Sequence, residues 1–134
     1  QLEHGIEGGM IAIYAKNLSR KTIFNALKNR QYYSTTGSRI QLEFSIDSAL
    51  MGSVLNVSNN SKVSIVMRAL GTRKITKVEL IKNSEIVFEK ISSNTKIEIK
   101  HQDRITKSNN WYYLKITQED DHIAWSSPIW VNVI

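Results

Sequence analysis

The sequence predicts a mainly β protein, with an antiparallel β-sandwich over residues 40–134 and one β/α unit over residues 1–39. Three observations lead to this prediction. From residue 40 onward, apolar and polar residues alternate with the period of two that marks a half-buried strand. Turn-forming residues separate seven or eight such runs, a spacing typical of an immunoglobulin-like sandwich. Before residue 40, a short apolar run bounded by glycine is followed by a stretch with helical periodicity.

Length and composition limit the class of protein further. The chain has 134 residues, 41% of them hydrophobic, a net charge of +6 and no cysteine. This length suits one domain or a small domain with an appended piece, and the hydrophobic content excludes wholesale disorder. The lack of cysteine excludes a disulfide scaffold, a thiolate metal site and a cysteine nucleophile. No window approaches about 18 consecutive apolar residues, so we expect no membrane contact through a spanning segment.

Residues 1–39 contain the predicted β/α unit. Met10–Tyr14 is an apolar run without alternation, typical of a strand buried on both faces, as in a parallel sheet. Ser19 is a suitable N-cap for a helix over residues 20–29. The apolar stripe of that helix is Ile23, Phe24, Ala26 and Leu27. One such unit cannot bury both of its faces, so we expect it to lean on a neighbouring domain or to form a homo-oligomer.

Residues 40–134 contain the predicted strands of the sandwich. Ile40–Asp47 alternates cleanly between apolar and polar residues, and Asn83-Ser84 predicts the tight turn of a hairpin. In the predicted strand Trp111–Thr117, Trp111 and Tyr113 lie on one side of the strand. Tyr112, Leu114 and Ile116 lie on the other side. The other predicted strands are Val63–Met67, Val78–Leu80, Ile86–Phe88, Lys96–Lys100, His122–Trp125 and Ile129–Val133.

The positive charge is concentrated in one segment. Residues 16–39 contain six basic residues and no acidic one: Lys16, Arg20, Lys21, Lys28, Arg30 and Arg39. Such a run can face a phosphate, a nucleic acid or an acidic domain, although a solvated helix face is its commonest explanation. No RNA-binding signature with interleaved glycines and aromatics occurs, so we do not expect a nucleic-acid partner.

The sequence contains few candidates for catalytic or metal-binding residues. His4, His101 and His122 are too far apart to form a local metal motif, and we expect the last two to be surface residues. No nucleophile elbow or phosphate loop is present. Residues 32–40, rich in hydroxyls, either order an oxyanion or connect two elements with hydroxyls that satisfy backbone groups. The aromatic residues near the end of the chain form either a stacking platform or sandwich core: Trp111, Tyr112, Tyr113, Trp125 and Trp130.

Several spaced motifs resemble a known family. The segment Gly8–Ala15 is followed by Leu18-Ser19-Arg20, Ala26-Leu27 with Arg30, and Tyr33 with Thr35–Ile40. This order resembles the C-terminal end of metal-dependent hydrolases of the PHP superfamily (polymerase and histidinol phosphatase), in the CehA/McbA-like subgroup. There a glycine-led strand precedes L-[ST]-R, A-L-x-x-R and Y-x-T-T-G-x-R-I. Trp111–Gln118 and Ala124–Val131 resemble the close of the same proteins, and the family usually has an acidic residue where Ser38 stands.

The resemblance implies a divalent metal, Zn²⁺ or Mn²⁺, in an upstream β/α barrel that would be the partner of this chain. Residues 1–39 would then be the last strand and helix of that barrel, and residues 40–134 the appended β-sandwich. His4 is near the place of the final histidine ligand of the family, and Arg20 and Arg39 are candidates for binding an anion. Because the ligand-rich motifs are missing, we expect this chain to hold no cofactor and to be inactive alone.

Two functions therefore follow from the sequence. The first is a C-terminal accessory region of a metal-dependent hydrolase acting on a phosphoester or related ester. The alternative is an immunoglobulin-like binding module that docks carbohydrate or protein through exposed aromatic residues. Because the first residue is Gln1, we expect the chain to be a piece of a longer protein. The compartment in which the protein works is left open.

Overall fold

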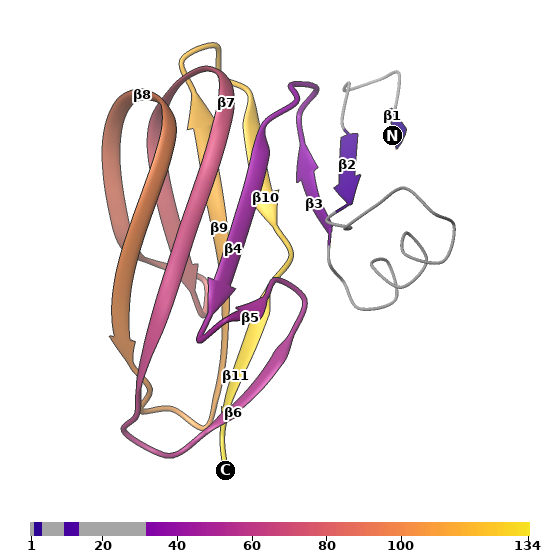
Figure 1. Cartoon of the computed structure of the whole chain (residues 1–134). Helices are drawn as coiled ribbons and strands as arrows, with labels where there is room; N and C mark the ends of the chain where they lie inside the picture. The colour runs from indigo at the N-terminus through magenta and orange to yellow at the C-terminus, as the bar shows by residue number, and fades with distance from the viewer. Residues whose placement is uncertain (1, 4–9, 14–31) are drawn as a thin grey trace.

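The computed structural model describes residues 2–3, 10–13 and 32–134, and all structural statements here concern these residues. They form strands and no helix, so no helix among them could cross a membrane. The strands are β1 (Leu2–Glu3), β2 (Met10–Ile13), β3 (Tyr32–Thr35), β4 (Gln41–Ile46), β5 (Ala49–Leu50), β6 (Val54–Val57), β7 (Lys62–Lys82), β8 (Glu85–Arg104), β9 (Asn109–Gln118), β10 (Ile123–Ser126) and β11 (Ile129–Val133) (Figure 1).

The strands form one hydrogen-bonded sheet that folds over on itself into two layers. The first layer contains β3, β10, β9, the C-terminal half of β7 and the N-terminal half of β8, with β11 and β6 beside β9. The second layer contains β5, β4, the N-terminal half of β7 and the C-terminal half of β8. Every pairing is antiparallel except that of β11 with β6. The predicted antiparallel sandwich is thus confirmed.

Strands β7 and β8 form one hairpin that runs through both layers. Their register extends from Lys82 opposite Glu85 to Lys62 opposite Arg104. The turn residues Asn83 and Ser84 have φ angles of 51° and 72°, the two positive values that a type I′ turn requires. The predicted turn is therefore confirmed. The prediction of separate strands at Val63–Met67 and Val78–Leu80 is wrong, because both lie in the single 21-residue strand β7.

Strand β7 passes from the second layer to the first between Leu70 and Ile75. The register with β8 shifts there, as expected of a bulge that bends a strand. Gly71 lies in this bend, where a Cβ atom would come within 2.5 Å of the Arg73 carbonyl oxygen and 2.5 Å of Gln118 Oε1. The bend therefore requires a residue without a side chain.

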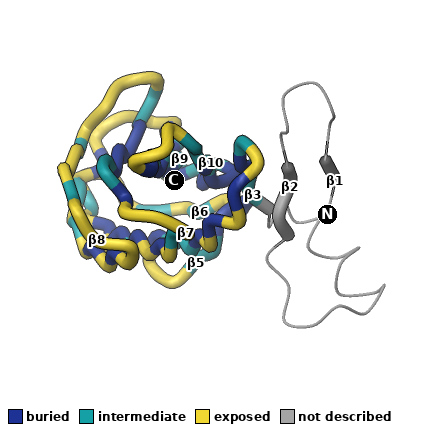
Figure 2. Tube along the Cα trace, turned by 90° about the horizontal axis from the view of Figure 1, so that it is seen from above, coloured by how far each residue is buried: buried dark blue, intermediate teal, exposed yellow. Residues whose placement is uncertain are grey.

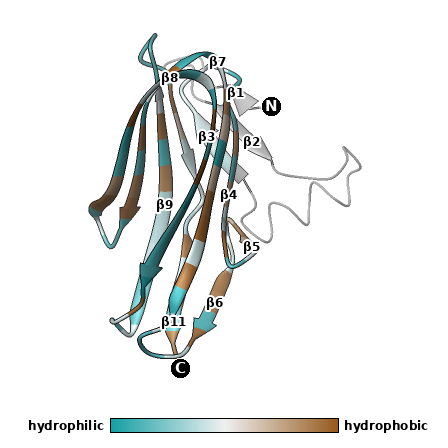
Figure 3. Cartoon of the chain, turned by 60° about the vertical axis from the view of Figure 1, so that its left-hand side comes forward, coloured by the Kyte–Doolittle hydropathy of each residue, from teal (hydrophilic) through white to brown (hydrophobic). Residues whose placement is uncertain are grey.

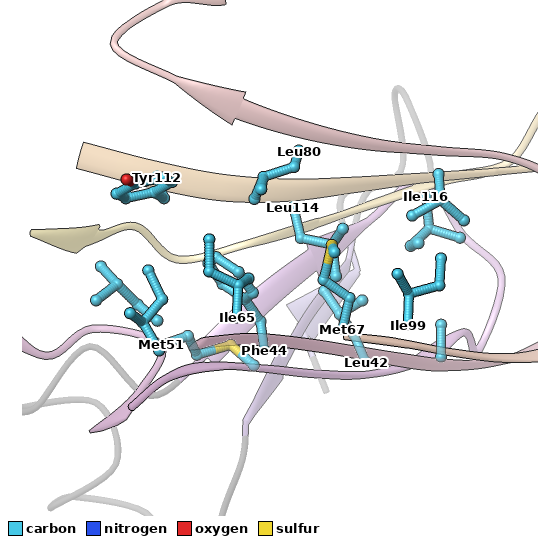
Figure 4. Close-up of a cluster of buried hydrophobic side chains, with 14 of the residues drawn as sticks. Leu42, Phe44, Met51, Ile65, Met67, Leu80, Ile99, Tyr112, Leu114 and Ile116 are labelled. Carbon is cyan, nitrogen blue, oxygen red and sulfur yellow. The ribbon is translucent and has the colours of Figure 1, made fainter. Parts of the chain in front are cut away.

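The hydrophobic core lies between the two layers, as the tube coloured by burial shows from above (Figure 2). Apolar and polar residues alternate along the long strands, so one side of each strand faces inward (Figure 3). Leu80, Tyr112 and Leu114 of the first layer lie across the core from Phe44 and Ile65 of the second (Figure 4). All five side chains have no exposed surface. The sequence predicts that Trp111 and Tyr113 lie on one side of β9 and that Tyr112, Leu114 and Ile116 lie on the other. The burial pattern of β9 confirms this.

The N-terminal part differs from the β/α unit that the sequence predicts. The strand at Met10–Ile13 is confirmed, but it pairs antiparallel with both β1 and β3, so the expected parallel sheet is not found. Residues 32–35 form strand β3 rather than part of a connector, and β3 pairs with β10 of the sandwich. The predicted helix over residues 20–29 lies outside the described residues. The upstream barrel stays a prediction.

Gly71→Ala tests the bend of β7. The added methyl group must displace the Arg73 carbonyl or the buried Gln118 amide, so we expect a loss of about 1–3 kcal/mol of unfolding free energy. Urea denaturation of the variant beside Ser93→Ala, an exposed position on β8, measures this. Equal midpoints for the two variants would contradict the role of Gly71.

Candidate functional site

The outward side of the first layer carries four large aromatic residues. Trp111 and Tyr113 of β9, Trp125 of β10 and Trp130 of β11 are all half-buried. Directly opposite residues of antiparallel strands share one side of a sheet. Trp130 lies opposite Trp111, and Trp125 lies opposite Lys115 between Tyr113 and Thr117. The four aromatic residues therefore share one surface, which we call the aromatic face.

Aliphatic residues extend the aromatic face toward both edges of the layer. Ile81 of β7 lies opposite Tyr113, and Ile86 of β8 lies opposite Ile81 with 54% of its surface exposed. On the other side, Val54 of β6 lies opposite Trp130 and is 52% exposed. Apolar side chains thus lie on the outward side from β6 to β8.

The outward side of the second layer is charged instead. Arg68 of β7 donates hydrogen bonds to Glu43 of β4, at 2.7 Å, and to Glu98 of β8. The hydrogen bond and charge of Arg68 lower the pKa of Glu98. Further exposed charged residues on this side are Lys62, Lys96, Lys100 and Arg104. This composition is typical of a surface that faces water.

The geometry of the Trp111–Tyr113 pair restricts what the aromatic face can bind. The two rings are nearly parallel, with an interplanar angle of 4° and centroids 5.9 Å apart. A sugar ring between them would need a contact distance of about 3.5–4 Å to each ring, or roughly 7–8 Å in all. The pair therefore cannot clasp a sugar, and it presents ring edges and outer faces to a partner.

A polar cluster holds residues 36–38 against the sandwich. Gln118 at the end of β9 is buried, and its Nε2 donates to Ser38 Oγ at 3.3 Å and to Asp120 Oδ1 at 3.1 Å. Its Oε1 accepts a hydrogen bond of 2.8 Å from the Thr72 amide, and the Ser38 and Thr72 hydroxyl oxygens are 2.6 Å apart. The Ser38 and Thr72 hydroxyls thus have side-chain hydrogen-bond partners inside the protein.

The structure brings Thr36 and His122 together in the same region. Thr36 Oγ1 accepts from the Ile123 amide at 2.9 Å and lies 3.0 Å from His122 Nδ1. His122 was expected at the surface, and it is half-buried beside this hydroxyl. His101, expected in a surface loop, lies in β8 with its ring centroid 4.8 Å from that of Phe88. The sequence could not indicate either contact: Thr36 and His122 belong to distant parts of the chain, and Phe88 and His101 lie far apart along the same strand β8.

The structure describes only one of the three predicted site residues, Arg39. His4 and Arg20 lie outside the described residues. Arg39 is exposed, and no hydrogen bond or ion pair of its side chain is found among the described residues. Residues 2–3, 10–13 and 32–134 contain no group of three or more His, Asp or Glu side chains that could hold a metal ion. The family resemblance assigns the implied metal to an upstream barrel, and that metal stays a prediction.

A second cluster joins the two layers at the other end of the sandwich. Lys82 Nζ and Tyr112 Oη of the first layer donate to Asp103 Oδ2 of the second, at 2.7 Å and 2.5 Å. Burial opposes ionisation of Asp103, but the hydrogen bonds from Lys82 and Tyr112 outweigh it and lower the pKa of this carboxyl. Burial and the hydrogen bond to Asp103 raise the pKa of Tyr112. The donors and acceptor of this cluster satisfy one another, so its role is structural. We call these three residues, Lys82, Asp103 and Tyr112, the clasp between the layers.

Comparison with known proteins gives relatives of unknown function. A family model described as "Protein of unknown function (DUF3604)" matches residues 2–67. The chain is 33% identical over 141 residues to uncharacterized proteins of Chlamydia pneumoniae, Chlamydia trachomatis and Chlamydia muridarum. The match covers 93% of this chain but only 23% of each relative, so the chain spans about a quarter of their length.

The chain also aligns with a solved structure. It comes from a study of the fibronectin(III)-like modules of CbhA from Clostridium thermocellum, with 18% sequence identity and a TM-score of 0.46. The alignment covers 70% of this chain and 94% of that one.

Gln118→Leu tests the polar cluster. Leucine removes the acceptor of the Thr72 amide and the donor to Ser38, so we expect a loss of about 1–3 kcal/mol in unfolding free energy. Hydrogen exchange at the Thr72 amide should also accelerate. Thr95→Ala, exposed on β8, is the control. Unchanged protection of the Thr72 amide would contradict this role of Gln118.

Asp103→Asn tests the clasp between the layers through its pH dependence. Because folding lowers the pKa of Asp103 below the ordinary value of about 3.9, its stabilisation is present above that value. It is lost as the pH falls through the lower pKa of the folded state. We therefore expect unfolding free energy to fall less between pH 5 and 2 in Asp103→Asn than in the wild type.

The partner variant provides the control for this measurement. Lys82→Met should flatten the same pH profile, and the double variant should lose less stability than the sum of the two single losses. Additive losses, or pH profiles parallel to that of the wild type, would show that the clasp does not act as a unit.

Proposed function

We propose that this chain is a non-catalytic accessory region of a larger metal-dependent hydrolase of the PHP type. The observation that carries the proposal is the binding of the motif residues Thr35–Ile40 into the sandwich. Ser38 and Thr36 contact Gln118 and His122, which belong to the far end of the chain. The segment that resembles the end of the barrel is thus joined to the sandwich by side-chain hydrogen bonds, which suits a permanent accessory role.

The polar clusters among the described residues support an accessory role. The groups around Gln118 and Asp103 satisfy one another and hold elements of the sandwich together. Relatives about four times as long supply room for a catalytic domain elsewhere. In this proposal an upstream barrel binds Zn²⁺ or Mn²⁺ and acts on a phosphoester or related ester.

The aromatic face favours a second candidate, an immunoglobulin-like binding module for carbohydrate or protein. Half-buried tryptophan and tyrosine side chains on an otherwise regular sheet are typical of the centre of a protein interface. The close spacing of Trp111 and Tyr113 leaves no room for a sugar ring between them, so a carbohydrate would stack on an outer ring face. A homo-oligomer through residues 1–39 stays a further prediction.

Metal titration tests the accessory role. We expect calorimetry of the purified chain with Mn²⁺ and with Zn²⁺ to give no binding tighter than the micromolar range, in wild type and in His4→Ala alike. The full-length parent should bind metal and hydrolyse a model phosphoester in a metal-dependent manner. Tight binding by the chain that His4→Ala abolishes, or turnover by the chain alone, would overturn the accessory role.

A further inference from the structure

We infer that, in the parent protein, the aromatic face is covered by the polypeptide that precedes this chain. The inference deepens the proposed function, because it requires that the sandwich belong to a longer protein. The inference assigns the aromatic face to a contact within one polypeptide. The alternative occupants are a glycan and a second copy of the chain, and the experiment must exclude both.

The contrast between the two outward sides of the sandwich is the first argument. The second layer faces outward with charged side chains such as Arg68, Glu43 and Glu98, already paired with one another. The first layer faces outward with four aromatic side chains and the exposed Ile86 and Val54. Both layers belong to one continuous sheet, so the difference is not imposed by the fold. An outward surface that exposes large apolar side chains to water is typical of a protein interface.

The path of the chain is the second argument. Strand β3 pairs with β10, and Ser34 lies directly opposite Trp125 of the aromatic face. Strands β2 and β1 continue from β3 away from β10, in the order β10-β3-β2-β1. Polypeptide before β1 therefore leaves the molecule from the edge of the layer that bears the aromatic face. A segment tethered there has a high effective concentration at this face, which favours it over free partners.

The polar residues of the face define the chemistry of the covering surface. Lys77 already pairs with Glu89 at 3.2 Å, whereas no ion pair among the described residues involves Lys115. Lys115 is half-buried between Trp125 of β10 and Glu79 of β7. The complementary surface is therefore mainly apolar, with a carboxylate placed to pair with Lys115. This chain spans 23% of the length of its relatives. The remaining polypeptide of such a protein is long enough to provide this complementary surface.

Hydroxyl-radical footprinting of the chain and of the full-length parent tests the inference. We expect the labelling rates of Trp111 and Trp125 to fall about tenfold or more in the full-length protein. Leu70, which is 44% exposed on the outward side of the second layer, should be labelled equally in both and is the control. Equal labelling of the tryptophans in both proteins would overturn the inference.

A charge reversal gives a second test, and the unfolding free energy of each variant is measured because Lys115 lies opposite the buried Glu79. In the full-length protein, Lys115→Glu should restore labelling of Trp111 and Trp125, because it opposes the expected carboxylate. Lys100→Glu, on the outward side of the second layer, should leave their protection intact. Protection that persists in Lys115→Glu would overturn the assignment of this face.

The alternatives give distinct results. Protection of the tryptophans in the isolated chain by a panel of soluble glycans, or by raising the chain concentration alone, would overturn the inference in favour of a carbohydrate or a second copy. Metal-dependent hydrolysis by the full-length protein is measured separately. Protection without hydrolysis would support the docking inference while overturning the hydrolase proposal, and hydrolysis without protection would do the reverse.

Discussion

The hydrogen-bonded pairing of β7 with β8 is the constraint on which the rest of the fold depends. This hairpin is common to both layers, so it connects them along one edge of the sandwich. The bend at Gly71 turns β7 over the core and aligns its second half with β9. Once β9 is aligned, β10 and β11 can pair with its two halves. The position of the aromatic face on β9, β10 and β11 is therefore a consequence of one bend in a neighbouring strand.

Two side-chain clusters secure the ends of this arrangement and differ in how they do so. Around Gln118, neutral hydroxyl and amide groups hold the segment that precedes β4 against the end of β9. Around Asp103, an ionised carboxylate joins Lys82 and Tyr112 across the layers. In each cluster the polar groups satisfy one another. The large aromatic side chains lie apart from both clusters, on the outward side of the first layer.

Prediction of the candidate site from sequence was partial for a physical reason. Alternation within Trp111–Thr117 correctly separated inward Tyr112 from outward Trp111 and Tyr113, because the side of a strand is a local property. The grouping of Trp125 and Trp130 with them depends on the register of β9 with β10 and β11, which no local pattern contains. The contacts of Gln118 with Ser38 and of Asp103 with Lys82 likewise join residues far apart in the chain. The sequence left the hydroxyl-rich segment that contains Ser38 as either an oxyanion-binding loop or a connector, and no local pattern indicated the partners of Ser38.

The sequence by itself determined the antiparallel β class, the inward residues of most strands and the turn at Asn83-Ser84, since each follows from period-two burial or from residues that tolerate positive φ. Tertiary structure decided that Val63–Met67 and Val78–Leu80 are one strand, because continuity across the Gly71 bend depends on pairing partners in two layers. It also decided that residues 32–35 form a strand, since β3 exists through its hydrogen bonds to β2 and β10. Backbone pairing over long sequence separations carries this information, and a side-chain pattern along the chain does not.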